Sequence, residues 1–225
     1  MKQQAKPKNH GFTLIELMVA MVISIIVMGA IYGVYQSQTR VQIVQEVHLE
    51  LQESLRAVLT IMEREIRTAG ADPTGNADAR IILANPDELH FTRDIDDTAG
   101  SGRFDGAITQ PNEDIRYAIR GGNLVRITDG DAGDGDVLLD NVDALDFVYL
   151  DSDGNVPADE DDIKYVEVTI VSRSGQSDRG FLGFGRHTDS VTYTDQQGDW
   201  LLGPENDNAR RFRLTTSVTC RNMPK

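Results

Sequence analysis

The chain has 225 residues, of which 36 are Asp or Glu and 22 are Lys or Arg, so its formal net charge at pH 7 is -14. Such an acidic chain is poorly suited to binding nucleic acid, because phosphate affinity comes largely from cationic side chains that displace counterions. The single cysteine, Cys220, excludes a scaffold held by internal disulfides. The length fits one globular domain plus an extension.

The amino-terminal segment combines positive charge with a long apolar run. Lys2, Lys6 and Lys8 precede it without any acid, and residues 17–35 contain Ser24 as their only strongly polar side chain. As a helix this run would be roughly 28 Å long, which matches the hydrocarbon core of a bilayer. Since positively charged flanks stay in the cytoplasm, the sequence predicts a membrane helix with an internal amino terminus and an exported remainder.

An ordinary cleaved secretory signal is the alternative, and the sequence beyond the apolar run argues against it. The run is longer than a typical signal core of about 7 to 15 residues, and no small-x-small cleavage site is well placed after it. An amphipathic pattern continues instead, with apolar side chains three and four positions apart. Its members are Val44, Val47, His48, Leu51, Leu55, Val58, Leu59, Met62 and Ile66. One helix is therefore predicted over residues 12–35 and 36–69, with Gly70 and Pro73 as stop signals.

The string GFTLIEL, from Gly11 to Leu17, follows the basic leader directly. It resembles the processing site of type IV pilins and of the related pseudopilins of type II secretion. The resemblance implies that prepilin peptidase removes residues 1–11 by cutting between Gly11 and Phe12, and that the new amino group of Phe12 is methylated. It further implies that an inner-membrane assembly platform moves the chain into a filament, where residues 12–35 pack among other minor and major pilins.

Glu16 places a carboxylate at the start of the apolar run. An ionised group there costs a few kcal/mol unless it is neutralised. After processing, the nearest cation is the amine of Phe12, either its own or that of a neighbouring subunit. The resemblance implies the neighbour's amine, which would set the axial register between subunits. The alternative is that Glu16 merely reaches the cytoplasmic interface.

Gly29 and Gly33 lie one helical turn apart in the apolar run, with Ser37 a further turn along. Such a row of small residues lets helices approach closely in lipid or in a filament core. Glycine is also common in membrane helices, so a chance spacing is an equally open alternative.

From Gly70 onward the apolar pattern changes to a period of two, which is typical of β-strands. The predicted strands are Arg80–Leu83, Glu88–Arg93, Ile115–Arg120, Leu124–Thr128, Asp136–Leu139, Ala144–Leu150, Lys164–Val171 and Phe212–Arg221. Gly121-Gly122-Asn123 is typical of a hairpin turn. The sequence thus predicts an α+β fold, in which the long amino-terminal helix packs on an antiparallel β-sheet head formed by residues 70–225. Cys220 falls on the inward set of its strand, which indicates a buried, unreactive thiol.

Four short segments of the head carry a looser resemblance. Residues 137–142 and 145–149, then 166–170, then Cys220-Arg221-Asn222, are similar in order and spacing to PilW-type minor pilins and their relatives, the J-type pseudopilins. Major pilins often close their carboxyl-terminal loop with a disulfide, which one cysteine cannot do. The resemblance therefore implies a minor pilin, with the J-type pseudopilin as the closest alternative.

The head contains few residue patterns typical of catalysis. His187 and Asp189 with nearby serines could be imagined as part of a triad, but no Gly-x-Ser-x-Gly elbow accompanies them. No Gly-x-x-x-x-Gly-Lys phosphate loop is present either. The sequence therefore predicts a non-enzymatic protein.

A calcium site is the one cofactor that the head suggests. Asp151, Asp153 and Asn155 offer oxygen ligands at alternate positions, with Asp159–Asp162 downstream. Val156 occupies the position where an EF-hand loop requires glycine, so a solvated turn is the favoured alternative. If the loop does bind calcium, the head could act as a calcium-dependent adhesion module displayed on the filament.

The region between Ser172 and Ala209 is long and rich in Gly, Asp and Gln. Its large apolar side chains are Phe181, Phe184, Tyr193 and Trp200. They are expected either to anchor the region on the sheet or to form a contact surface for another subunit, and anchoring is favoured because an unanchored loop of this length costs much entropy.

Together with these patterns, the resemblance implies a minor pilin that helps to initiate a type IV pilus or lies near its tip. The expected location is the inner membrane, crossed once with the head in the periplasm, and then the filament at the cell surface. Its expected partners are other pilins, the prepilin peptidase and the assembly platform.

Overall fold

The computed structural model describes residues 11–95, 104–128, 135–175 and 187–223. The long helix α1 (Leu14–Ile66) is followed by strands and one short 3-10 helix, η1 (Glu160–Asp162). The chain divides into two compact units, Met1–Glu46 and Val47–Lys225, with the division inside α1. Each unit is described by itself below.

The first unit holds the amino-terminal part of α1, and its apolar side chains lie on the surface. Leu14, Met28 and Ile31 are typical, with 79%, 71% and 63% of their surface exposed. This part of the helix has a mean hydropathy of 2.6 over its most apolar 18 residues, and it is long enough to cross a membrane. Ser24 donates its hydroxyl to the Ala20 carbonyl at 2.7 Å, so its polarity is satisfied within the helix.

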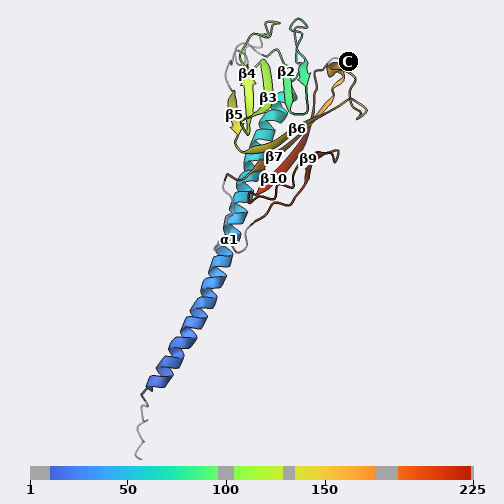
Figure 1. Cartoon of the computed structure of the whole chain (residues 1–225). Coiled ribbons are helices and arrows are strands. Elements are labelled where there is room, and N and C mark those ends of the chain that lie inside the picture. Colours follow the sequence, from blue (N-terminus) through green and yellow to red (C-terminus); the bar gives the residue numbers. More distant parts are fainter. Residues whose placement is uncertain (1–10, 96–103, 129–134, 176–186, 224–225) are drawn as a thin grey trace, which may run out of the picture. The chain divides into compact units, whose positions relative to one another are not determined.

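The second unit contains two main antiparallel sheets and a small hairpin (Figure 1). Five strands form the first sheet in the order β1-β2-β3-β4-β5: Ile81–Ala84, Glu88–Thr92, Asp114–Arg120, Asn123–Thr128 and Asp136–Leu139. Three strands form the second in the order β10-β7-β6: Arg211–Thr219, Tyr165–Arg173 and Val142–Leu150. The hairpin pairs β8 (Tyr193–Thr194) with β9 (Trp200–Leu202).

These strands confirm the predicted α+β class and the predicted antiparallel pairing, with bounds that differ by at most two residues. The sequence did not show that the head divides into two sheets, nor did it show β8 and β9. Gly121 and Gly122 form the predicted turn between β3 and β4, with φ of 59° and 79°. That left-handed backbone at two successive positions is the geometry that favours glycine in a tight hairpin.

The carboxyl-terminal part of α1 packs on both main sheets in one core. Leu55, Met62 and Ile66 are fully buried, and of the predicted stripe, which begins at Val44, the part from Leu55 to Ile66 lies in that core. The core also contains Phe91 and Tyr117 of the first sheet and side chains of β6, β7 and β10 in the second. The helix ends at Ile66, three residues before the predicted end at Ala69, and Gly70 follows in left-handed backbone with φ of 73°, which fits its predicted role as a stop signal.

Cys220 follows β10 directly and is fully buried, as predicted. Burial raises the pKa of its thiol to about 12, against an ordinary value of 9.0. Since only the thiolate reacts, we expect Cys220 in the native chain to be alkylated by iodoacetamide at least about 100-fold more slowly than in urea-unfolded chain at the same pH. Mass spectrometry of the intact chain measures both rates. Equal rates would contradict the burial.

The aromatic side chains between Ser172 and Ala209 were predicted either to anchor this region on the sheet or to form a contact surface, and the two described ones differ. Tyr193 is buried with Ala144 and Val171 on the second sheet, so it anchors the β8–β9 hairpin as predicted. Trp200 does not, because 69% of its surface is exposed. Phe181 and Phe184 lie outside the described residues.

Candidate functional site

The amino-terminal end of α1 is organised by a reciprocal pair of bonds between Thr13 and Glu16. The Thr13 backbone N–H and hydroxyl both donate to Glu16 Oε2, at 2.8 and 2.9 Å. The Glu16 backbone N–H returns a bond to the Thr13 hydroxyl at 3.3 Å. This is a capping box, in which a Thr and a Glu three residues later satisfy free N–H groups at the start of a helix.

The capping box is a role for Glu16 that the sequence interpretation missed, although the Thr-x-x-Glu spacing was its signal. Both bonds from Thr13 go to Oε2 and the residue is exposed, so the carboxylate remains accessible to a further cation. Phe12 is 90% exposed beside it. The geometry therefore fits a carboxylate that starts the helix within its own chain and can still pair with an amine from another.

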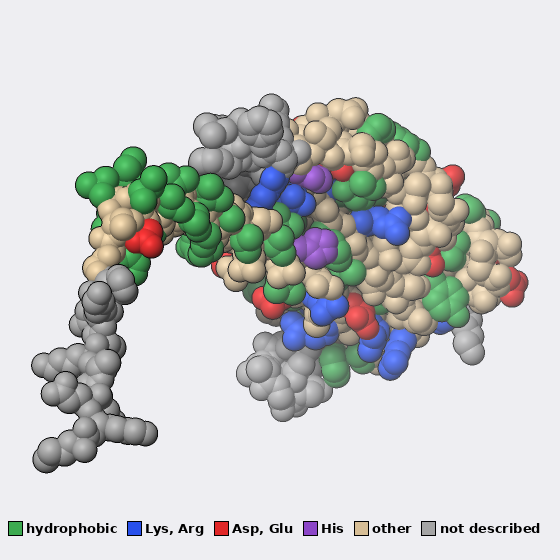
Figure 2. All heavy atoms as spheres, turned by 90° about the horizontal axis from the view of Figure 1, so that it is seen from below, with side chains coloured by type: hydrophobic (Ala, Val, Ile, Leu, Met, Phe, Trp, Pro, Cys, Tyr) green, Lys and Arg blue, Asp and Glu red, His purple; other side chains and the backbone are tan. Residues whose placement is uncertain are grey.

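The two glycines of the apolar run lie open in the single chain. A methyl group added at Gly29 or Gly33 would meet no atom within 4 Å. Figure 2 shows hydrophobic side chains covering this part of the helix. The face thus has room for another helix, and whether the glycines are needed for that contact stays a prediction.

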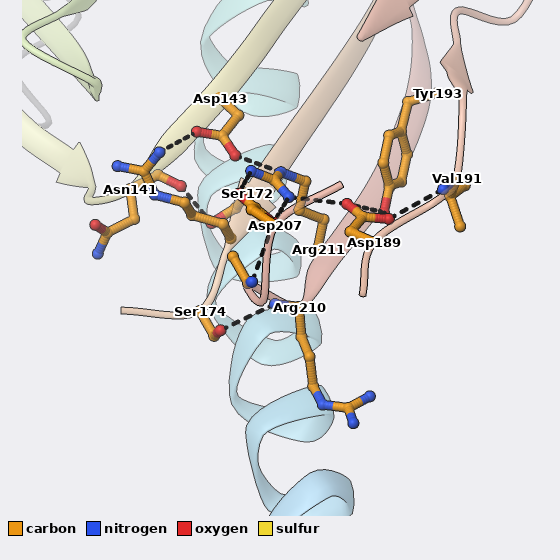
Figure 3. Close-up of polar contacts among 12 residues, drawn as sticks. Asn141, Asp143, Ser172, Ser174, Asp189, Val191, Tyr193, Asp207, Arg210 and Arg211 are labelled. Atoms are coloured by element: carbon orange, nitrogen blue, oxygen red, sulfur yellow. Dashed lines mark hydrogen bonds and ion pairs between the residues drawn. The ribbon is translucent and has the colours of Figure 1, made fainter. Parts of the chain in front are cut away.

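Asp189, suggested as a triad member beside His187, instead belongs to an ion cluster centred on Arg211 (Figure 3). The buried Arg211 guanidinium binds Asp189 at 2.9 Å, Asp143 at 2.6 Å and Asp207 at 2.7 and 2.8 Å. Asp189 also accepts the Tyr193 hydroxyl. The Asp189 carboxylate is therefore committed to a structural role.

The Arg211 cluster joins the carboxyl-terminal excursion to the second sheet. Asp143 lies on β6 and Arg211 on β10, whereas Asp189 and Asp207 lie on the segments before β8 and after β9. The hydrogen bonds that Arg211 donates, first to Asp207 and then to Asp189 and Asp143, outweigh burial and raise the pKa of Arg211. Local sequence patterns contain little sign of this cluster, because Arg211 precedes the strand predicted from Phe212 onward.

A second buried ion cluster lies beneath the first sheet, at Glu65 of α1. Arg126 binds its carboxylate through two nitrogens, each at 2.9 Å, Arg93 lies 3.6 Å away, and the Tyr117 hydroxyl donates to Oε2. Tyr117 and Arg126 are direct cross-strand partners on β3 and β4. Burial alone would raise the pKa of Glu65, but the bonds from Arg126 and Tyr117 outweigh it and hold that pKa below its ordinary value.

The suggested calcium loop closes on its own backbone. Asp151 Oδ1 accepts the backbone N–H groups of Asp153 and Asn155, each at 2.8 Å, and the Asp159–Asp162 stretch contains η1. Among the described residues, no three His, Cys, Asp or Glu side chains come together as metal ligands would. These contacts are those of a solvated turn, and calcium binding here stays a prediction.

Comparisons with known proteins concern the amino terminus and the fold. Residues 6–32 match the family model described as the prokaryotic N-terminal methylation motif. The structure resembles that of a type IV-like pilin from Thermus thermophilus, with a TM-score of 0.50 at 17% sequence identity, over 77% of this chain and 98% of that one. No curated protein matches the sequence.

The two findings agree with each other and with the geometry. The motif covers residues 6–11 of the predicted leader, the Thr13–Glu16 capping box and most of the exposed apolar helix. The structural resemblance covers the fold, a long amino-terminal helix packed on antiparallel sheets. The chain therefore carries the prokaryotic N-terminal methylation motif and has a fold like that of a type IV-like pilin.

Proposed function

We propose that the chain is a minor pilin of the PilW type, a structural subunit without enzymatic activity that initiates a type IV pilus or lies near its tip. The observation that carries this proposal is the prepilin methylation motif at the start of an exposed apolar helix, joined to a pilin-like head. The minor role is supported by a head whose lone cysteine is buried and free, since it folds without the loop disulfide that many major pilins have.

In the proposed mechanism, prepilin peptidase cuts between Gly11 and Phe12, and the Phe12 amine is then methylated. The apolar part of α1 first anchors the chain in the inner membrane with the head in the periplasm. The assembly platform then transfers that helix into the filament core, where other pilins cover its exposed apolar side chains. Glu16 pairs with the Phe12 amine of a neighbouring subunit and so sets the register.

Deletion of the gene tests the proposal against its closest alternative. We expect the deletion strain to lose surface pili, and a plasmid copy of the gene to restore them. Normal pili with secreted enzymes retained in the periplasm would instead identify a J-type pseudopilin of type II secretion. If both pili and secretion were normal, the proposal and this alternative would both be wrong.

Variants at Thr13 and Glu16 separate helix capping from subunit register. Glu16→Gln keeps a capping box, because glutamine also serves at that position, but removes the charge. Thr13→Ala weakens the cap by about 0.5 to 2 kcal/mol and keeps the charge. We therefore expect Glu16→Gln to reduce incorporation into filaments at least about tenfold, since a buried charge pair is lost, and Thr13→Ala to assemble nearly normally.

Immunoblots of sheared filaments measure incorporation in both strains. The size of the mature chain is the control that prepilin cleavage has occurred in each variant. Failure of Thr13→Ala together with normal assembly of Glu16→Gln would show that capping, not charge, is what the filament needs.

A further inference from the structure

The head contains a groove of about 450 Å³ along β6, the edge strand of the second sheet. The β8–β9 hairpin, the residue 156–160 segment, Ala84 and Pro86 also line it. Phe147 and Leu201 contribute apolar lining. Two large apolar side chains of the lining are unusually open, since Trp200 is 69% exposed and Val156 is 83% exposed.

The groove carries negative charge without a basic side chain. Its described lining includes Asp146, Asp159, Glu160, Asp195 and Asp199, and no Lys, Arg or His. Asp146 Oδ2 is buried and has no hydrogen-bond partner among the described residues. Burial first, and then the charges of Asp195 and Asp199, raise the pKa of Asp146. A buried carboxylate oxygen beside two other acids is costly unless a cation approaches it.

The arrangement suits an organic cation better than a metal ion. Within the described ranges, no three acidic side chains are close enough together to serve as metal ligands. A guanidinium group spreads one charge over five N–H donors and can reach carboxylates that lie farther apart. Its planar group also stacks on an aromatic face, and its methylene stem packs on apolar side chains.

The Trp200 ring is held in a fixed position beside the groove, where a guanidinium could stack on it. Its indole N–H donates to the Gly203 carbonyl at 3.0 Å, which fixes the ring while most of its surface stays exposed. The neighbouring Asp199 donates its backbone N–H to Asp195 Oδ1 at 2.7 Å, so the turn that carries both acids is also ordered.

From this charge complementarity we infer that the groove binds an arginine side chain of a partner protein, with an apolar residue beside that arginine packing against Trp200 and Val156. The inference concerns the head alone and does not depend on the chain being a pilus subunit. It assigns a binding role to the β8–β9 hairpin. Tyr193 explains how this hairpin is anchored, but it does not explain why Trp200 is exposed.

The single tryptophan of the chain gives a direct readout. The full-length chain in nonionic detergent micelles is titrated with the peptide acetyl-Leu-Arg-Leu-amide while Trp200 fluorescence is recorded. We expect a saturable change with this peptide, and none with the matched peptide in which neutral citrulline replaces arginine. A similar response to both peptides, or no saturable response to the arginine peptide, would overturn the inference.

Two variants locate the binding. Asp199→Asn changes an exposed side chain and keeps the backbone bond to Asp195, and Asp146→Asn removes the charge of a half-buried carboxylate whose Oδ2 is buried. We expect each to weaken peptide binding about tenfold, whereas Asp140→Asn, an exposed acid outside the groove, should bind as the wild type does. Unchanged binding in Asp199→Asn would overturn the inference even if Asp146→Asn failed to fold.

Discussion

Replacing Glu65 with glutamine is expected to lower the free energy of unfolding of the head by about 3 to 5 kcal/mol. The Glu65 side chain is 8% exposed, and its carboxylate neutralises the nearly buried guanidinium groups of Arg126 and Arg93. Glutamine has the same shape but carries no charge, so both cations would remain buried without their counter-ion. Urea denaturation of the full chain in detergent micelles, followed by near-ultraviolet circular dichroism, measures the change.

Glu63 provides a matched control on the same helix. It forms an ion pair with Arg67, but both side chains are about 40% exposed, at 39% and 44%. Such surface pairs contribute about 0 to 1 kcal/mol, so Glu63→Gln should change the stability little. If the two variants were equally stable, the buried cluster would not hold α1 to the first sheet as argued.

The Glu65 cluster also has a defined pH dependence. The pKa of Glu65 is lower in the folded chain than the ordinary value of 4.5, so the folded state favours the ionised form of Glu65. The stabilisation is therefore complete above the ordinary value and is lost as the pH falls through the folded-state pKa. The difference in stability between the wild type and Glu65→Gln should accordingly shrink in acid.

The parts of the fold that the sequence predicted are those that depend on local patterns. The stripe from Leu51 to Ile66 repeats at the helical period, and β10 alternates with period two, so both elements could be placed without tertiary information. The string from Gly11 to Leu17 is also a local signal, because its residues are contiguous in the sequence. Each of these signals can be recognised within one short stretch of the chain.

The parts that were missed depend on side chains that are far apart in the sequence. Glu65 meets Tyr117 and Arg126 across 52 and 61 residues, and its place three residues after Met62 on the buried stripe was the only local sign. Asp143 meets Arg211 across 68 residues. The division into two sheets likewise follows from which strands pair, which alternation within one strand does not specify.

Replacing Arg211 with methionine should also destabilise the head by about 3 to 5 kcal/mol, and it should act on a different part of the structure. The Arg211 side chain is 2% exposed and so is that of Asp189, while Asp143 is 11% exposed. Methionine fills a similar volume but leaves these carboxylates buried near one another without their shared cation. Arg173 still binds Asp143 at 2.6 Å, so the loss of Arg211 should affect Asp189 more than Asp143.

Two further variants identify the cause of the loss. Arg213 lies two residues along β10 and is exposed, so Arg213→Met is the matched control and should be nearly neutral. Arg211→Lys keeps the charge but cannot bind three carboxylates in the planar geometry of a guanidinium, so its stability should be intermediate. A Lys variant as stable as the wild type would mean that charge alone suffices.

Proteolysis distinguishes the Arg211 cluster from the Glu65 cluster. Because Arg211 joins the segments before β8 and after β9 to the second sheet, its loss should release them for cleavage before the head unfolds globally. Limited proteolysis with mass spectrometry should then find early cuts between residues 187 and 209 in Arg211→Met, but not in Glu65→Gln. The same cuts at the same rate in both variants would show that they loosen the head as a whole, and that Arg211 has no local role in holding this excursion to the sheet.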